Sequence, residues 1–249
     1  MKRETQNILL ILLGGALVKI AVNGDYLRYV KPAQQPWIIV GGAVMVLLGA
    51  VAILRDLRAA RVATAPASPD HDHGDGDGDG HAHSTRPAWL LLVPVLAVFL
   101  IAPPALGADS VIRTEARVPA SAAAAGSMAF PALPAGNVVP LPVNEFVSRA
   151  GWDTGGTLNG RTVSLTGFVV HTGGSTLLAR LVISCCAADA FPVTVRLRGG
   201  EADPLASDAW IQVTGQVVPG TATKDNSYTP DFTPASVTTI PAPKDPYEY

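Results

Sequence analysis

Apolar residues in the first 108 positions lie in three nearly continuous blocks. The blocks run from about Ile8 to Val22, from about Trp37 to Leu54, and from Ala88 to Ala108. A helix needs roughly 20 apolar residues to cross the hydrocarbon core of a bilayer, and three such runs are unusual in a soluble domain. The pattern therefore predicts three transmembrane helices in a lipid bilayer. Glycines in the first two blocks would let these helices approach closely: Gly14, Gly15, Gly41, Gly42 and Gly49.

Beyond residue 160 the apolar pattern changes to an alternation with period two, which is typical of half-buried strands. Five segments show it, separated by Gly, Asp, Asn and Pro clusters: "GRTVSLTGFVVHTG", "TLLARLVIS", "FPVTVRLRG", "AWIQVTGQVVPG" and "ASVTTIP". They predict an all-β C-terminal domain, with an OB-like small antiparallel barrel as the expected fold and a small sandwich as the alternative. A short amphipathic helix should precede it, with Val143, Phe146 and Val147 at helical spacing and Gly151 as its stop.

Basic residues predict the orientation in the membrane, because loops on the cytoplasmic side carry an excess of Lys and Arg. Arginines follow the second block and precede the third, so the N-terminus should be cytoplasmic and the C-terminal domain extracytoplasmic. The "ALG" before Ala108 leaves cleavage of the third block open. The predicted parts are a two-helix transmembrane hairpin (1–54), a cytoplasmic His/Asp-rich loop (55–87), a third transmembrane helix (88–108), an Ala/Pro-rich tether (109–140) and the OB-like β domain (141–249).

Composition narrows the possible functions. The 249 residues are 48% hydrophobic and only 15% charged, as expected if part of the chain lies in lipid. The formal net charge is −2, so no basic field is available to bind nucleic acid. No combination of nucleophile, base and acid is recognisable, so we predict no catalytic residue, no certain cofactor and no enzymatic activity.

Four histidines in the low-complexity segment "PDHDHGDGDGDGHAHS" are candidate metal ligands. Imidazole binds zinc, nickel and copper at cytosolic pH, and the intervening aspartates add oxygen donors. The segment has too few apolar residues to fold alone, so a solvated acidic linker is the alternative to a divalent-metal site. The candidate ligands are His71, His73, His81 and His83.

The two cysteines of the chain are adjacent, in "SCCAADAFP", at the end of the second predicted strand. Neighbouring strand residues point to opposite faces, and Cα atoms about 3.8 Å apart are closer than an ordinary disulfide requires. Three interpretations stay open: a soft-metal site formed by Cys185 and Cys186 with Asp189 or His171, a redox-labile vicinal disulfide, or a packing role. A metal bound here would be zinc or another divalent ion.

The stretches "GGALVKIAVNGDYLRYVKPAQQPWIIVGG", "LTGFVV…LLARLVISCCAADAFPVTV", "AWIQVTGQV" and "PAPKDPYEY" resemble the YcgQ-like membrane proteins, a bacterial family of unknown function. "CCAADA" is the most specific of these motifs. The resemblance implies a bacterial cell-membrane protein, the smaller subunit of a two-component permease whose larger, polytopic YcgR-like partner carries most of the spans. It also implies a link to zinc homeostasis, and it supplies no catalytic residues.

Three functional hypotheses follow. The first is a non-enzymatic accessory subunit of a permease for a divalent metal or a metal-linked solute, since three almost wholly apolar helices cannot line an ion path alone. The second is a membrane-tethered thiol redox protein that uses Cys185 and Cys186. The third is a plain scaffold module.

Overall fold

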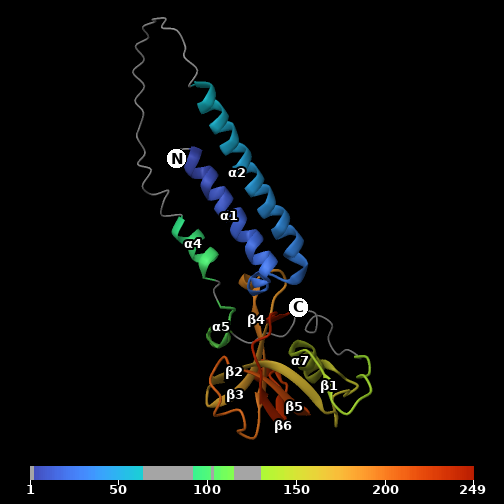
Figure 1. Cartoon of the computed structure of the whole chain (residues 1–249). Coiled ribbons are helices and arrows are strands. Elements are labelled where there is room, and N and C mark those ends of the chain that lie inside the picture. Colours follow the sequence, from blue (N-terminus) through green and yellow to red (C-terminus); the bar gives the residue numbers. More distant parts are fainter. Residues whose placement is uncertain (1–2, 64–91, 102–103, 115–129) are drawn as a thin grey trace, which may run out of the picture. The chain divides into compact units, whose positions relative to one another are not determined.

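A computed structural model describes residues 3–63, 92–101, 104–114 and 130–249 (Figure 1). The chain divides into two compact units. The first contains the long N-terminal helices and the described residues up to Ile101. The second contains the described residues from Pro104 to Tyr249 together with the short segment Leu27–Lys31, which lies between the two long helices in the sequence.

Two helices of the first unit are long and apolar enough to cross a membrane. Helix α1 spans Arg3–Asn23 and helix α2 spans Gln35–Ala63, with short 3-10 helices at Asp25–Arg28 and Pro32–Gln34 between them. The apolar windows Gln6–Asn23 and Pro32–Ala59 have mean hydropathies of 1.6 and 2.6. Only 22% and 11% of these windows are buried, so most of their apolar side chains are not covered by protein. This pattern suggests membrane association.

Helices α1 and α2 run side by side (Figure 1). They pack against each other through glycines. A Cβ atom built on Gly14 would lie 2.7 Å from the carbonyl oxygen of Gly42, and one on Gly42 would lie 2.8 Å from Cγ2 of Val18. Gly49 is similarly close to Ile11. Three of the five predicted glycines therefore lie at the contact. The other two, Gly15 and Gly41, have open space where a Cβ would stand.

Three membrane spans are not supported. Within the predicted third block the structure describes a helix, α4, only over Leu92–Leu100. Nine residues at about 1.5 Å per residue cover roughly 14 Å, about half the hydrocarbon thickness. The end of the block also belongs elsewhere: Ala108 begins helix α5 (Ala108–Arg113) and is buried in the core of the second unit. Hydropathy alone could not separate an apolar residue that faces lipid from one that packs in a core.

The second unit contains a mixed seven-stranded sheet. Its strands are β1 (Val139–Pro140), β2 (Val163–Thr172), β3 (Ser175–Val182), β4 (Phe191–Leu197), β5 (Trp210–Val218), β6 (Asp231–Thr239) and β7 (Tyr247–Glu248). The order is β1-β2-β5-β6-β4-β3-β7, with a further pairing of β2 and β3. All five predicted strands are confirmed, and the two-residue strands β1 and β7 were missed because two residues carry no periodicity.

The sheet differs from the predicted antiparallel closed barrel. The pairs β1–β2, β3–β7 and β4–β6 are parallel. The sheet bends back on itself, but β4 and β6 meet over only two residue pairs, Arg196–Asp231 and Leu197–Phe232. A closed barrel is therefore not shown. Alternation predicts which residues face a core, but it does not predict the direction or the extent of each strand pairing.

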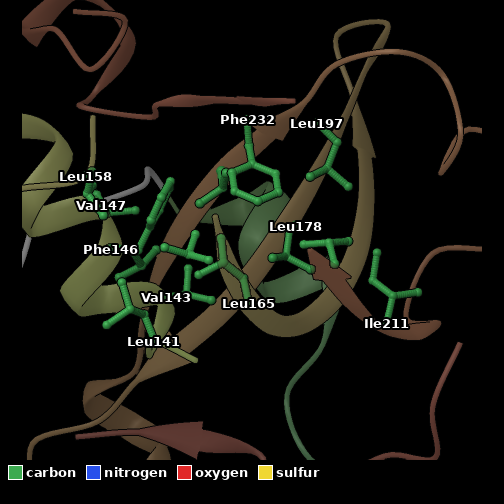
Figure 2. Packing of buried hydrophobic residues seen from close by; sticks show 14 of the residues in the cluster. Leu141, Val143, Phe146, Val147, Leu158, Leu165, Leu178, Leu197, Ile211 and Phe232 are labelled. Carbon is green, nitrogen blue, oxygen red and sulfur yellow. The ribbon is translucent and has the colours of Figure 1, made fainter. Parts of the chain in front are cut away.

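Helix α7 (Val143–Trp152) covers the main core of the sheet (Figure 2). Val143, Phe146 and Val147 are at most 2% exposed, which confirms the predicted amphipathic helix. Phe146 meets Phe232 of β6 edge to face, with ring centroids 5.6 Å apart. Gly151 does not stop the helix: it lies in its last turn, where a Cβ would be in contact with Tyr228. The helix ends one residue later, at Trp152.

The C-terminal residues complete the fold as an edge strand. Tyr247 and Glu248 pair in parallel with Leu181 and Val182 of β3. The Glu248 carboxylate accepts the N–H groups of Val143 and Asn144, both at 2.8 Å, and so satisfies the first turn of α7. It also lies 3.5 Å from Nε of the buried Arg180. Burial raises the pKa of Glu248, and burial likewise lowers the pKa of Arg180, so their attraction does not fully offset desolvation.

Prediction for the helix pair. Gly42→Val should reduce the thermal stability of the full chain in mild detergent by about 1–3 kcal/mol, because the added side chain would overlap Val18 and the Gly14 carbonyl. Gly41→Val is the matched control, with the same change in the same helix but open space around it. Thermal aggregation midpoints in the same detergent compare the two variants, and the midpoint of Gly42→Val should be the lower one. Equal losses for the two variants would show that the glycine contact is not the cause.

Prediction for the C-terminal carboxylate. Glu248→Gln should cost about 2 kcal/mol of unfolding free energy near neutral pH, because one buried N–H of α7 loses its acceptor. Because burial raises the pKa of Glu248, the folded state binds the Glu248 proton more tightly than the unfolded state does. In the unfolded state the pKa of this carboxyl group is near 4.5. The contribution of Glu248 to the free energy of unfolding is therefore largest below pH 4.5. It declines as the pH rises through the pKa of Glu248 in the folded state.

In Glu248→Gln this part of the pH dependence should disappear. The exposed Glu201→Gln is the matched control and should leave both stability and its pH profile unchanged. Near-ultraviolet circular dichroism melts of the full chain at several pH values test this. If the stability of Glu248→Gln depended on pH in the same way as the stability of the wild type, the Glu248 carboxylate would not be the source of this pH dependence.

Candidate metal centre

The Cys185–Asp189 turn begins just after strand β3. The last residue joined to the edge strand is Ile183, whose N–H donates to the carbonyl oxygen of Glu248 at 3.0 Å. Cys186 is extended (φ −153°, ψ 167°) and precedes the 3-10 helix η3 (Ala187–Asp189). The cysteines thus lie just beyond the predicted strand end. Because the backbone has left the strand there, side-chain alternation no longer sends the two thiols to opposite faces.

The carboxylate of Asp189 holds the backbone of this turn. Its Oδ1 accepts the N–H of Ser184 at 2.8 Å, and its Oδ2 accepts the N–H groups of Cys185 at 2.8 Å and Cys186 at 3.4 Å. Hydrogen bonding from the Cys185 thiol is the largest cause that lowers the pKa of Asp189, and the backbone N–H groups lower it further. The carboxylate is therefore ionised at neutral pH and aimed at both cysteines.

The side chains of the two cysteines lie close together. The Sγ atoms of Cys185 and Cys186 are 3.6 Å apart, without a disulfide bond. Cys185 is exposed and Cys186 is half-buried, so neither acts as a core residue. One ligand atom from each cysteine and from Asp189 lies within 4.8 Å of the other two. The arrangement suits one thiophilic divalent ion with two sulfur donors and one oxygen donor, leaving a coordination position open.

Hydrogen bonding to Asp189, and secondarily to Cys186, raises the pKa of the Cys185 thiol from 9.0 to about 11. The free thiol is therefore protonated near neutral pH. Thiol–disulfide exchange begins with a thiolate, so this environment weighs against a fast redox nucleophile. A metal ion replaces the proton, and its binding would then release protons and strengthen as pH rises.

His171, the alternative ligand, is not part of this group. Its Nε2 lies 2.7 Å from the carbonyl oxygen of Leu205, and its Nδ1 lies 3.2 Å from Oγ1 of Thr176. Thr176 in turn donates to Asp203 at 2.5 Å. The three side chains line a cavity of about 370 Å³ beside the β2–β3 turn. Both ring nitrogens have polar neighbours within 3.2 Å, and these contacts link the hairpin to the loop before β5.

The four predicted loop ligands, His71, His73, His81 and His83, lie outside the described residues. Their proposed metal binding stays a prediction. Another partner of the turn, the segment Leu27–Lys31, was not predicted from the sequence. Val30 forms an antiparallel bridge with Cys186. The two residues are more than 150 positions apart and no shared motif marks them, so no local signal could have revealed the contact.

These features define a curled β-sheet domain with an exposed two-thiol turn, joined in the sequence to apolar helices. Residues 153–249 match the family model of the DUF1980 C-terminal domain, a bacterial domain of unknown function. The matched region contains strands β2 to β7 and the whole Cys185–Asp189 turn. The match does not confirm the YcgQ-like name. No curated protein and no solved structure matches the chain.

Prediction for the thiols. In a Cys186→Ser background, Asp189→Asn should lower the pKa of Cys185 from its raised value toward 9.0, because the anionic acceptor is removed. Alkylation by iodoacetamide follows the thiolate fraction, so the rate near neutral pH should rise about tenfold or more. Asp225→Asn, at an exposed position, is the control. Mass spectrometry of the alkylated chain across a pH series gives the midpoint, and an unmoved midpoint would rule out Asp189 as the cause.

Proposed function

We propose that this chain is a non-enzymatic accessory subunit of a two-component bacterial permease and that its Cys185–Asp189 turn binds zinc or another divalent metal ion. In this proposal the protein is a multi-pass protein of the cell membrane with a cytoplasmic N-terminus. The C-terminal domain is extracytoplasmic and its curled sheet is OB-like. A larger YcgR-like polytopic subunit performs the transport.

One observation carries the metal assignment: two thiols and a carboxylate converge within 4.8 Å on an exposed turn. Sulfur donors favour zinc and other soft or borderline ions over magnesium and calcium. A structural zinc site is closed by four protein ligands, whereas three leave a position for water or an exchanging ligand. The exposure of Cys185 gives an ion direct access from solvent. Such a site is suited to taking up and passing on an ion.

The accessory role follows from the apolar character of the described helices. The stretches 8–18 and 36–54 contain no charged side chain. A path for an ion through a membrane needs polar or charged groups along it. The helix contact is instead formed by glycines and aliphatic side chains, which suits packing. We therefore assign transport to a second, polytopic protein.

Prediction for the proposed function. The full chain, purified from its bacterial membrane in mild detergent with His71, His73, His81 and His83 changed to Ala, should retain about one zinc per chain by elemental analysis. Cys185→Ser and Cys186→Ser should each abolish this zinc, because two ligands cannot retain the ion. Ser184→Ala is the control and should not change it, since only the backbone N–H of Ser184 is used in the turn.

The same preparation tests the partner. Mass spectrometry of the wild-type eluate should show a polytopic membrane protein in constant ratio to this chain. Zinc without a partner would limit the function to metal binding. A thiol oxidoreductase trapped as a mixed disulfide at Cys185 or Cys186 would favour the redox alternative, and neither zinc nor any partner would leave a scaffold module.

A further inference from the structure

The segment between the two long helices contacts the metal turn directly. Residues Leu27–Lys31 belong to the same compact unit as the β-sheet domain. The N–H of Ala187 donates to the carbonyl oxygen of Tyr29 at 2.7 Å, and the N–H of Lys31 points at the carbonyl oxygen of Cys185 at 3.5 Å. These contacts flank the Val30–Cys186 bridge and form a short antiparallel pairing. The backbone of the turn thus pairs with a distant segment, in which Val30 lies 156 positions before its partner Cys186.

A second contact fixes the same segment. The hydroxyl of Tyr247 donates to the carbonyl oxygen of Arg28 at 3.1 Å and accepts the N–H of Leu106 at 3.2 Å. Tyr247 is only 2% exposed and is held in β7 by its pairing with Leu181. Its position is therefore set by the core of the domain. The segment is attached at two points, one of which is the metal turn itself.

The turn is consequently constrained from two directions. Asp189 holds the N–H groups of Ser184, Cys185 and Cys186 from within the turn. The pairing with Tyr29 and Lys31 holds the carbonyl of Cys185 and the N–H of Ala187 from outside. Together they fix the residues on both sides of Cys186. A site whose ligands are already placed loses less entropy when the ion binds.

We infer that metal binding at Cys185, Cys186 and Asp189 is coupled to docking of the Leu27–Lys31 segment on the turn. Docking preorganises the ligands and strengthens metal binding. By thermodynamic reciprocity, the bound metal strengthens docking by the same factor. This inference rests on the proposed metal site and assigns it a function beyond binding: its occupancy is transmitted to the segment that joins α1 to α2 in the sequence.

The test uses Ala187, because one substitution there removes a single docking hydrogen bond. Ala187 is the first residue of η3, a position where proline is well tolerated. The preceding Cys186 is already extended, as a residue before proline must be. Ala187→Pro therefore deletes the N–H that Tyr29 accepts and keeps the turn conformation. Ala187→Ser is the matched control, because it also changes the side chain but keeps the N–H.

The experiment titrates zinc into the full chain in mild detergent, with His71, His73, His81 and His83 changed to Ala so that only the turn binds. Ala187→Pro should weaken zinc binding about tenfold relative to Ala187→Ser, within the usual range of coupling between two sites. Independently, zinc should slow hydrogen exchange of the Lys31 amide in the chain with an unchanged turn. Lys31 offers no ligand to the ion, so its amide reports docking alone. Cys185→Ser should remove that protection.

The outcomes separate the two proposals. No zinc binding at the turn of the otherwise unchanged chain overturns both the metal site and the coupling. Zinc binding that is equal in Ala187→Pro and Ala187→Ser, with Lys31 exchange unaffected by zinc, overturns the coupling alone. The exchange measurement needs no substitution in the turn, so a misfolded Ala187→Pro variant would not obscure the result.

Discussion

The pairing of the last few residues with strand β3 is the interaction on which most of this domain depends. β7 is only two residues long, yet the backbone of Glu248 accepts the N–H of Ile183, where β3 gives way to the cysteine turn. The Glu248 carboxylate accepts the first two N–H groups of α7. The Tyr247 hydroxyl forms hydrogen bonds with the segment before α5 and with the loop after α1. A short edge strand thus positions one helix, one turn and two distant segments at once.

The chemistry of the turn follows from a single carboxylate. Asp189 accepts three backbone N–H groups, which bends the chain so that two adjacent cysteines share one side. The same anion raises the pKa of Cys185, which keeps the free thiol protonated and slow to react. In the proposed metal site, a divalent ion would have to replace this proton, so its binding would strengthen as pH rises. The residue that shapes the turn therefore also keeps the free thiol protonated near neutral pH.

Prediction succeeded where a single element determines the pattern. The five longer strands, the apolar face of α7 at Val143, Phe146 and Val147, and the two long apolar helices were all visible as periodicity or continuous hydropathy. Prediction failed where the role of a residue depends on which distant residues it contacts. Ala108 was predicted to be part of a membrane span, but it packs in the core of the second unit. His171 was the alternative to Asp189 as a candidate ligand, and the structure places its ring nitrogens next to Leu205 and Thr176.

The sequence by itself determined that Cys185, Cys186 and Asp189 lie within a few residues of one another, because short spacing brings side chains together whatever the fold. It also determined which segments are apolar and which alternate. Only the tertiary structure decided that β4 pairs in parallel with β6, that Glu248 lies at the start of α7, and that Val30 meets Cys186. These contacts join residues far apart in the chain through backbone hydrogen bonds. Backbone groups are the same in nearly every residue, so their pairing leaves no signature in the sequence.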